Sequence, residues 1–128
     1  MQNTDTSSPR PLVLVVEDDA FVRAVAVDAL EDEGFEIIEA PSADYAAIVL
    51  GNREDIRLVF TDVAMPGTMD GFDLARAILA MYPHIPVLIA SGALPKGITE
   101  VMPGTRFLPK PYRMTHVVQV IREMMAVS

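Results

Sequence analysis

Short apolar runs that alternate with helical patterns constrain the fold of this chain more than any other feature. Five runs predict strands at residues 12–16, 35–40, 56–61, 85–90 and 105–108. Each is followed by residues with helical periodicity, at 20–33, 42–50, 71–82, 96–102 and 114–126. Strands that are continuously apolar and alternate with helices predict a parallel sheet covered on both faces, with the run at 35–40 nearer a sheet edge.

Helix-boundary residues support these assignments. Ser42 is placed as an N-cap, Gly34 follows the end of the first helix, and Asp70 or Gly71 opens the third. The fourth helix is the weakest prediction, because two prolines and two glycines crowd residues 95–104 and leave room for only a short or irregular helix. The last helix carries more apolar residues than a single core-facing stripe requires.

Composition limits the classes of protein to consider. The chain has 128 residues, 51% of them hydrophobic, which fits one domain with a sizeable core. We expect residues 1–10 to be a flexible leader and 11–128 to form the domain. A net charge of −8 disfavours nucleic-acid or anionic-membrane binding, and the absence of cysteine excludes thiolate sites. No apolar run approaches the roughly 20 residues that span a bilayer, and a cytoplasmic location is expected.

Chemically useful side chains follow four of the predicted strands. Glu17, Asp18 and Asp19 follow the first, Asp62 the third, Ser91 the fourth and Lys110 the fifth. Right-handed crossovers bring the carboxyl ends of parallel strands to one edge, where ligands bind in open α/β sheets. Helix capping by the acid triplet, and a turn role for Asp62, are the structural alternatives.

An oxygen-only set of ligands indicates a hard cation. Mg²⁺ is bound by one or two carboxylates together with water and phosphate oxygens. Lys110 supplies a point charge for a phosphoryl oxygen, and Ser91 supplies a hydrogen-bond donor. A carboxylate nucleophile that carries a phosphoryl group beside a divalent ion is established chemistry.

Five segments together resemble the receiver domain of two-component response regulators. They contain Val15–Asp19, Phe60–Pro66, Met69–Gly71, Val87–Gly92 and Phe107–Pro111, in family order and spacing. The resemblance covers the chain from about Leu12 to its end. It implies a doubly wound, flavodoxin-like α/β fold, a (βα)5 unit with strand order 2-1-3-4-5.

The resemblance also implies a role for each site residue. Asp62 matches the phosphoacceptor, and Lys110 and Ser91 match the groups that contact the phosphoryl oxygens. Glu17, Asp18, Asp62 and the backbone carbonyl of Ala64 match the Mg²⁺ ligands, with Asp18 the more direct ligand of the acid pair. Ser91 and Phe107 match the switch residues, and Lys110-Pro111 matches a peptide bond that is usually cis.

By this resemblance, Asp62 accepts phosphate from a phosphohistidine and thereby switches a protein-interaction surface. The implied partners are a sensor histidine kinase or histidine phosphotransfer protein and a downstream protein, without nucleic acid or membrane. A homodimer through the face between the fourth and fifth helices is a further expectation. Apart from self-phosphorylation and autodephosphorylation, no enzymatic activity is expected.

Three departures and two alternatives accompany this interpretation. Gly67-Thr68 lengthens the loop after Pro66 by one residue relative to many receivers, and the irregular segment 93–104 leaves the usual output face in doubt. Ala64 and Ala93 are small residues at positions that tune phosphoryl lifetime in the family. The alternatives are a Mg²⁺-dependent phosphohydrolase and a pseudo-receiver that binds partners without phosphorylation. His84 and His116 are assigned surface or capping roles.

Overall fold

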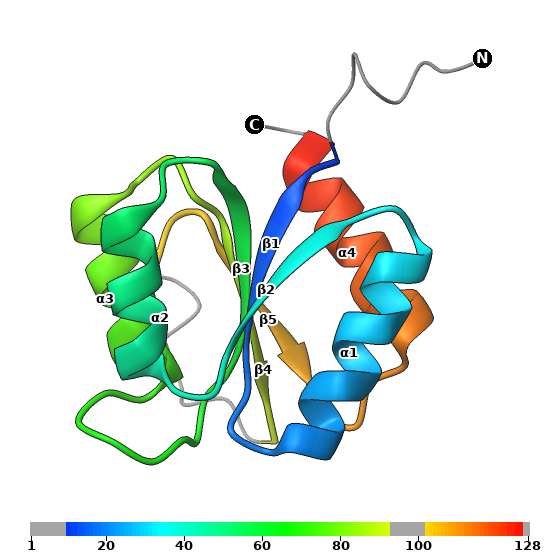
Figure 1. Ribbon diagram of the computed structural model, residues 1–128, viewed down its shortest axis with the longest axis horizontal. Coiled ribbons are helices and arrows are strands. Elements are labelled where there is room, and N and C mark those ends of the chain that lie inside the picture. The colour runs from blue at the N-terminus through cyan, green and yellow to red at the C-terminus, as the bar shows by residue number, and fades with distance from the viewer. Residues whose placement is uncertain (1–9, 93–101, 127–128) are drawn as a thin grey trace.

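A five-stranded parallel sheet lies between two pairs of helices in the computed structural model, which describes residues 10–92 and 102–126 (Figure 1). The elements are β1 (Leu12–Val16), α1 (Ala20–Asp32), β2 (Glu36–Ala40), α2 (Ala43–Asn52), β3 (Ile56–Asp62), α3 (Gly71–Met81), β4 (Val87–Ser91), β5 (Thr105–Pro109) and α4 (Met114–Ala126). The strand order β2-β1-β3-β4-β5 confirms the predicted doubly wound α/β fold.

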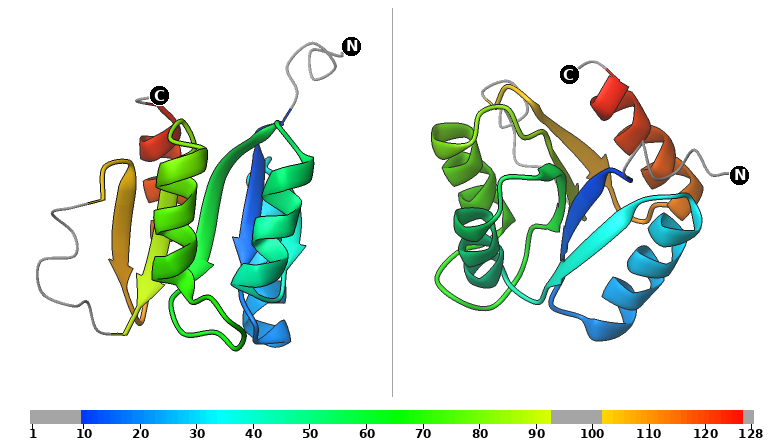
Figure 2. Two further views of the ribbon diagram at one scale, coloured as in Figure 1. Left: turned by 90° about the vertical axis from the view of Figure 1, so that its left-hand side faces the viewer. Right: turned by 45° about the horizontal axis from the view of Figure 1, so that its top comes forward.

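Each face of the sheet has its own apolar core. Alternate strand residues point to opposite faces, so Leu14 packs with α2 and α3, whereas Val15 packs with α1 and α4. The side views show one helix pair on either side of the sheet (Figure 2). Between these layers, β1 and β4 are buried along their whole length. This double covering explains why their sequences are continuously apolar.

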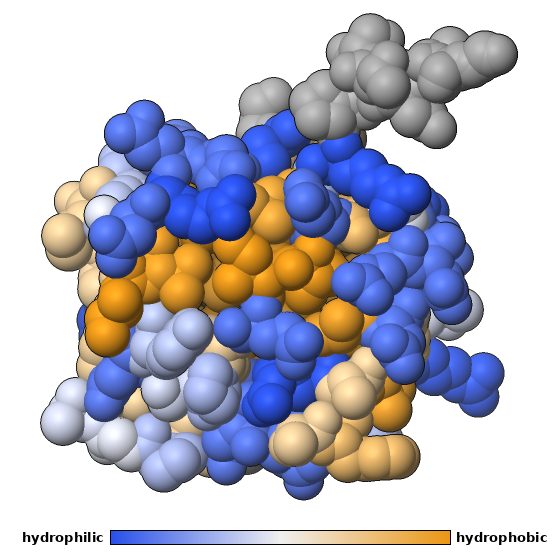
Figure 3. Space-filling view, viewed as in Figure 1, coloured by the Kyte–Doolittle hydropathy of each residue, from blue (hydrophilic) through white to orange (hydrophobic). Residues whose placement is uncertain are grey.

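The edge strands are less buried than the central ones. In β2, Ile37 and Ile38 are half-buried while Glu36 and Glu39 are exposed, as expected for a strand at a sheet edge. An apolar area crosses the middle of the face on which β2 and α2 lie (Figure 3). Ile48 of α2 contributes to the exposed apolar surface of the molecule, with 64% of its area accessible.

Local hydrogen bonds set the element boundaries. Ser42 caps α2 by accepting from the amide of Tyr45, and Gly34 adopts φ +98° after the C-cap of α1, both as predicted. Asp70 is the N-cap of α3 and forms a capping box with Asp73. These contacts fix the directions in which the helices leave the strands.

Several predicted boundaries are wrong by one or two residues. The Phe35 amide bonds to the Leu30 carbonyl in the closing turn of α1, so β2 begins one residue later. Likewise the Ile85 amide bonds to the Tyr82 carbonyl, and β4 starts only at Val87, after Pro86. β4 and β5 each extend one residue further than predicted, to Ser91 and Pro109. The first and third helices end one residue earlier than predicted, and α2 extends two residues further, to Asn52.

The last helix matches its predicted range, and its apolar residues are mostly core. Five of them are buried against the sheet: Val117, Val118, Val120, Ile121 and Met124. Residues 1–9 of the predicted leader at 1–10, Ala93 and most of the predicted helix at 96–102 lie outside the described residues. Of that helix, Met102 is described, and it is buried in the core on the α2 and α3 side.

Candidate functional site

The carboxyl ends of all five strands lie at the same edge of the sheet (Figure 1). Asp62 and Ser91 are the last residues of β3 and β4, while Glu17 and Lys110 directly follow β1 and β5. The β3–β4 register pairs Asp62 with Ala90, which places Ser91 one residue further along the neighbouring strand. The fold therefore brings the predicted side chains to one edge.

Asp62 forms an ion pair with Lys110 at the centre of this edge. The distance from Lys110 Nζ to Asp62 Oδ1 is 2.5 Å, and the Asp62 residue is only 9% exposed. The Lys110 amide also donates to the Ser91 carbonyl at 2.8 Å, which links the ends of β4 and β5. The Lys110-Pro111 bond is cis, as predicted.

The acid triplet divides between two roles. Glu17, Asp18 and Asp62 each offer a carboxylate oxygen within 4.8 Å of the others, an arrangement that can hold a metal ion. Asp19 instead caps α1, accepting from the amides of Phe21 and Val22 at 2.9 and 3.1 Å. The capping interpretation is thus confirmed for Asp19, and metal binding stays a prediction for Glu17 and Asp18.

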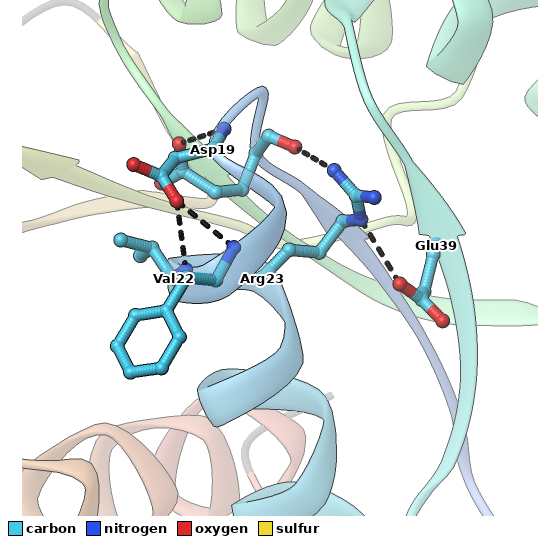
Figure 4. Close-up of polar contacts among 6 residues, drawn as sticks. Asp19, Val22, Arg23 and Glu39 are labelled. Atoms are coloured by element: carbon cyan, nitrogen blue, oxygen red, sulfur yellow. Dashed lines mark hydrogen bonds and ion pairs between the residues drawn. The ribbon is translucent and has the colours of Figure 1, made fainter.

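Arg23 of α1 holds the main chain at Glu17 and was missed by sequence reasoning. Its Nη1 donates to the Glu17 carbonyl at 2.8 Å, and its Nε pairs with Glu39 of β2 at 2.9 Å (Figure 4). The Glu17 amide donates to the Ala40 carbonyl at 3.0 Å, so both main-chain groups of Glu17 are fixed. The available signal was that Arg23 is the only basic residue of α1 and follows three acids.

Burial and charge shift two ionisable groups of the site. Burial raises the pKa of Glu17, opposed by the hydrogen bond from the Asp19 amide and reinforced by the nearby Asp62 charge. Burial alone would lower the pKa of Lys110, but the hydrogen bond and charge of Asp62 outweigh it and raise that pKa. Lys110 is therefore a permanent cation beside Asp62 at neutral pH.

Comparison with known proteins decides the family. The response regulator receiver domain family matches residues 13–122. The chain belongs to this family. It is 38% identical over 112 residues to the response regulator protein FleR of Pseudomonas aeruginosa, covering 85% of this chain and 23% of FleR. The sensor kinase CckA of Brucella abortus is 34% identical over 119 residues, which cover 88% of this chain and 12% of that kinase.

Solved structures support the same conclusion. The crystal structure of the receiver domain from the hybrid histidine kinase CckA superposes with a TM-score of 0.75 at 32% identity, covering 89% of this chain and 98% of that one. The chain thus spans about a quarter or less of the two curated relatives but nearly all of an isolated receiver domain. Receiver domains are signalling modules of two-component systems, and this chain is one of them.

The loop of this receiver between β3 and α3 contains Ala64, which is exposed two residues after Asp62. At the far end of the loop, the Gly71 amide donates to the Val63 carbonyl at 2.8 Å. A Cβ atom at Gly71 would overlap the backbone carbonyl of Asp62. Only glycine fits this close approach, which accounts for the Asp-Gly pair at the start of α3.

The predicted switch residues share one face of the sheet. Ser91 is 5% exposed, and by strand alternation it points to the same side as Ile89, toward α3. Phe107 of β5 pairs with Ile89 in register and packs on that side against Phe72, with ring centroids 6.0 Å apart. Phe107 is half-buried, so its ring lies at the border between core and solvent.

None of the helices within residues 10–92 and 102–126 is long and apolar enough to cross a membrane. His84 is exposed in the turn before β4, and His116 is exposed in the first turn of α4. Neither histidine belongs to the acidic cluster.

Proposed function

We propose that this receiver accepts a phosphoryl group on Asp62 from a phosphohistidine of a sensor histidine kinase or histidine phosphotransfer protein. The observation that carries the proposal is the buried Asp62 carboxylate, which pairs with Lys110 on one side and approaches the Glu17 and Asp18 carboxylates on the other. A nucleophilic carboxylate, a cation and a metal-binding acid pair are the parts that phosphoryl transfer requires.

The site residues fit a magnesium ion. The three carboxylates supply hard oxygen ligands within reach of one ion, and the carbonyl of Ala64, an exposed residue, is the proposed fourth protein ligand. When bound, Mg²⁺ neutralises charge on the phosphoryl oxygens during transfer. Asp18 is exposed whereas Glu17 is 8% exposed, which favours Asp18 as the more direct ligand.

The protein residues act by position and charge. An Asp62 carboxylate oxygen forms a bond to phosphorus while the bond from phosphorus to the imidazole nitrogen breaks, and the electron pair of that bond stays on the histidine. Lys110 exchanges its pairing with Asp62 for a phosphoryl oxygen. Ser91 donates a hydrogen bond to another oxygen, and Phe107 turns inward from the sheet border into the space that Ser91 vacates.

Exposed apolar side chains next to the site give the phosphodonor a surface to dock on. At the start of α1, Phe21 is 77% exposed, and Val22 and Val25 are also exposed. Val22 further lines a surface pocket with Lys110 and Tyr112. Exposed apolar side chains that gather in one area mark surfaces at which proteins bind one another.

The output is a contact with a downstream protein, and the domain acts in the cytoplasm. The net charge of −8 gives the domain itself no attraction for nucleic acid or anionic membranes. We also propose a homodimer through the face between the predicted fourth and fifth helices, of which the structure describes α4 as the fifth. Catalytic turnover is limited to self-phosphorylation and autodephosphorylation.

Phosphorylation by a small phosphodonor tests the proposal. The wild type, incubated with acetyl phosphate and Mg²⁺, is expected to gain one phosphoryl group by intact-protein mass spectrometry. Asp62→Asn is expected to gain none, because its amide is not a nucleophile. Asp55→Asn, which changes an exposed acid paired with Arg53, is the matched control and should behave as the wild type.

Three outcomes would contradict the proposal. Labelling of Asp62→Asn at the wild-type level would exclude Asp62 as the acceptor. Sustained release of phosphate from small phosphate esters would indicate a phosphohydrolase instead. A wild type that binds neither Mg²⁺ nor beryllofluoride would indicate a pseudo-receiver.

A further inference from the structure

The β3–α3 loop, residues 63–70, is fixed at its ends by contacts already described. At one end the Val63 carbonyl accepts from the Gly71 amide. At the other end, the Asp70 amide and side chain form the capping box with Asp73, with bonds of 3.1 and 2.8 Å. The stretch from Ala64 to Thr68 lies between these fixed points, and Ala64, Pro66, Gly67 and Thr68 are exposed.

Asp44, from the first turn of α2, holds the exposed part of this loop. Its Oδ2 accepts from the Thr68 amide at 3.1 Å, and its Oδ1 accepts from the Thr68 hydroxyl at 3.0 Å. Both carboxylate oxygens therefore bind one residue, which fixes direction as well as distance. Thr68 belongs to the Gly67-Thr68 pair that makes this loop longer than in many receivers.

Gly67 makes the close approach to Asp44 feasible. It adopts φ +111°, in the region that favours glycine, and a Cβ atom there would lie 2.8 Å from Asp44 Oδ2. The backbone at Gly67 is therefore shaped to bring Thr68 onto the carboxylate. The contact between Thr68 and Asp44 therefore determines the path of the lengthened loop.

Asp44, the other partner in this contact, belongs to a helix that is held in place. Ala43, Ala46 and Leu50 bury α2 against the sheet, and Ser42 caps the helix independently of Asp44. An acid in the first turn also suits the helix dipole, which is the purely local role that Asp44 could have. The bonds to Thr68, which is 24 residues away in the sequence, are not needed for that role.

We infer that Asp44 is a positioning residue of the phosphoacceptor site, which holds Thr68 and thereby fixes the loop that carries the Ala64 carbonyl. The inference rests on the proposed function, since Ala64 matters only if its carbonyl binds the metal. Releasing Thr68 removes the side-chain contact that fixes the exposed part of the loop between Met65, which packs against the core, and the Asp70 cap of α3. Binding of the metal must then order that stretch, which weakens affinity.

Magnesium affinity, measured by calorimetry, tests the inference. Asp44→Ala is expected to weaken Mg²⁺ binding about 3- to 10-fold, less than the loss typical of contacts to a side-chain ligand. Thr68→Val, which removes the hydroxyl without changing charge, should weaken it in the same direction but less. The double variant should match Asp44→Ala, because both substitutions break one contact.

A measurement without metal tests the contact between Asp44 and Thr68 itself. Hydrogen exchange of the Thr68 amide should be faster in Asp44→Ala than in the wild type, because the amide loses its acceptor. Ser42→Ala is the control, since it removes the α2 cap and leaves the Asp44 contact in place. It should lower the stability of the protein while Mg²⁺ affinity and Thr68 exchange stay at wild-type values.

The outcomes separate the inference from the proposed function. Wild-type Mg²⁺ affinity in both Asp44→Ala and Thr68→Val would overturn the inference and leave the function standing. An equal loss of affinity in Ser42→Ala would also overturn it, since α2 stability alone would then explain the effect. A wild type that binds no Mg²⁺ would overturn the function and the inference with it.

Discussion

The two loops that carry the proposed metal ligands are built in opposite ways. Between β1 and α1, residues 17–19 form a short connection whose first residue has both main-chain groups bonded, to Ala40 and Arg23. Between β3 and α3, residues 63–70 form a longer connection that is bonded at its ends and held in its middle by Asp44.

This difference teaches how geometry and stability are coupled at the site. In the short loop, the contacts that place Glu17 also join α1 to the ends of β1 and β2, so substitutions there should affect stability and metal binding together. In the long loop, most of the middle is exposed and only Met65 packs against the core, so metal binding can change while the fold stays intact. Gly71 is the exception, because it packs directly on the end of β3.

Gly71→Ala should have the largest effect on stability, and it tests the packing of Gly71 on the end of β3. The added Cβ atom overlaps the Asp62 backbone, so either α3 or the end of β3 must shift. We expect the free energy of unfolding to fall by about 3 kcal/mol, at the upper end of the usual cost of overpacking. Urea denaturation followed by circular dichroism measures this change.

Gly51→Ala is the matched control. Gly51 lies in α2, and a Cβ atom there would have open space around it. Alanine is the better helix former, so this variant should gain about 0.5–1 kcal/mol. If Gly71→Ala were as stable as the wild type, the junction between the long loop and the sheet would be looser than we describe.

Arg23→Met should have the next largest effect and tests the short loop. Methionine keeps the apolar stem but loses the bonds to the Glu17 carbonyl and Glu39. The Arg23 side chain is 18% exposed, so we expect a loss of about 1–2 kcal/mol in the free energy of unfolding. Mg²⁺ affinity should fall in the same variant, and calorimetry measures it.

The direction of that change in affinity is informative. Removal of a nearby positive charge would by itself strengthen Mg²⁺ binding, whereas loss of the Glu17 anchor weakens it. Tighter binding in Arg23→Met would therefore refute the anchoring role. Arg53→Met is the control, because the Arg53–Asp55 pair is exposed and should leave stability unchanged.

Glu17→Gln should have the smallest effect on stability. It tests how much the burial of the Glu17 carboxylate in the short loop destabilises the fold. The pKa of Glu17 is raised in the folded protein, chiefly by burial, above an ordinary value of 4.5. Between the ordinary pKa and the raised pKa, the unfolded state binds fewer protons than the folded state. The stability of the wild type therefore falls as the pH rises through that window. The neutral variant should lose less stability over the same range.

Denaturation of metal-free protein on both sides of that window checks this prediction. At neutral pH, Glu17→Gln should be more stable than the wild type, and Mg²⁺ should stabilise the wild type more than the variant. Glu54→Gln, at an exposed position before β3, should show neither effect. A parallel pH dependence in the wild type and Glu17→Gln would contradict the assignment.

The parts of this structure that depend on periodicity were predictable from the sequence. Apolar runs such as residues 12–16 specify strands buried on both faces, and their order with the helices specifies the parallel sheet. The site residues Asp62 and Lys110 were predictable because each follows a strand, and parallel strands share one functional edge. The sequence alone therefore predicts that the acidic and basic groups lie at one site.

The contacts that support the site could not be predicted. Arg23 and Glu39 are 16 residues apart, and Asp44 and Thr68 are 24 apart, with no periodic pattern that joins them. Their pairing depends on where α1 and α2 pack, which is a tertiary property. The division of the acid triplet could not be predicted either, because an aspartate that caps a helix and one that joins a carboxylate cluster look alike in sequence.

The pairing of Asp62 with Lys110 has a consequence for the charge balance of the site. By formal charge, the three carboxylates and one ammonium leave an excess of two negative charges, which one divalent cation would cancel. On the proposed function, phosphorylation converts the neutralised centre into one with a net negative charge. That negative charge attracts a hydrogen-bond donor, and Ser91 at the end of the neighbouring strand is such a donor. The change in net charge can therefore by itself transmit the signal.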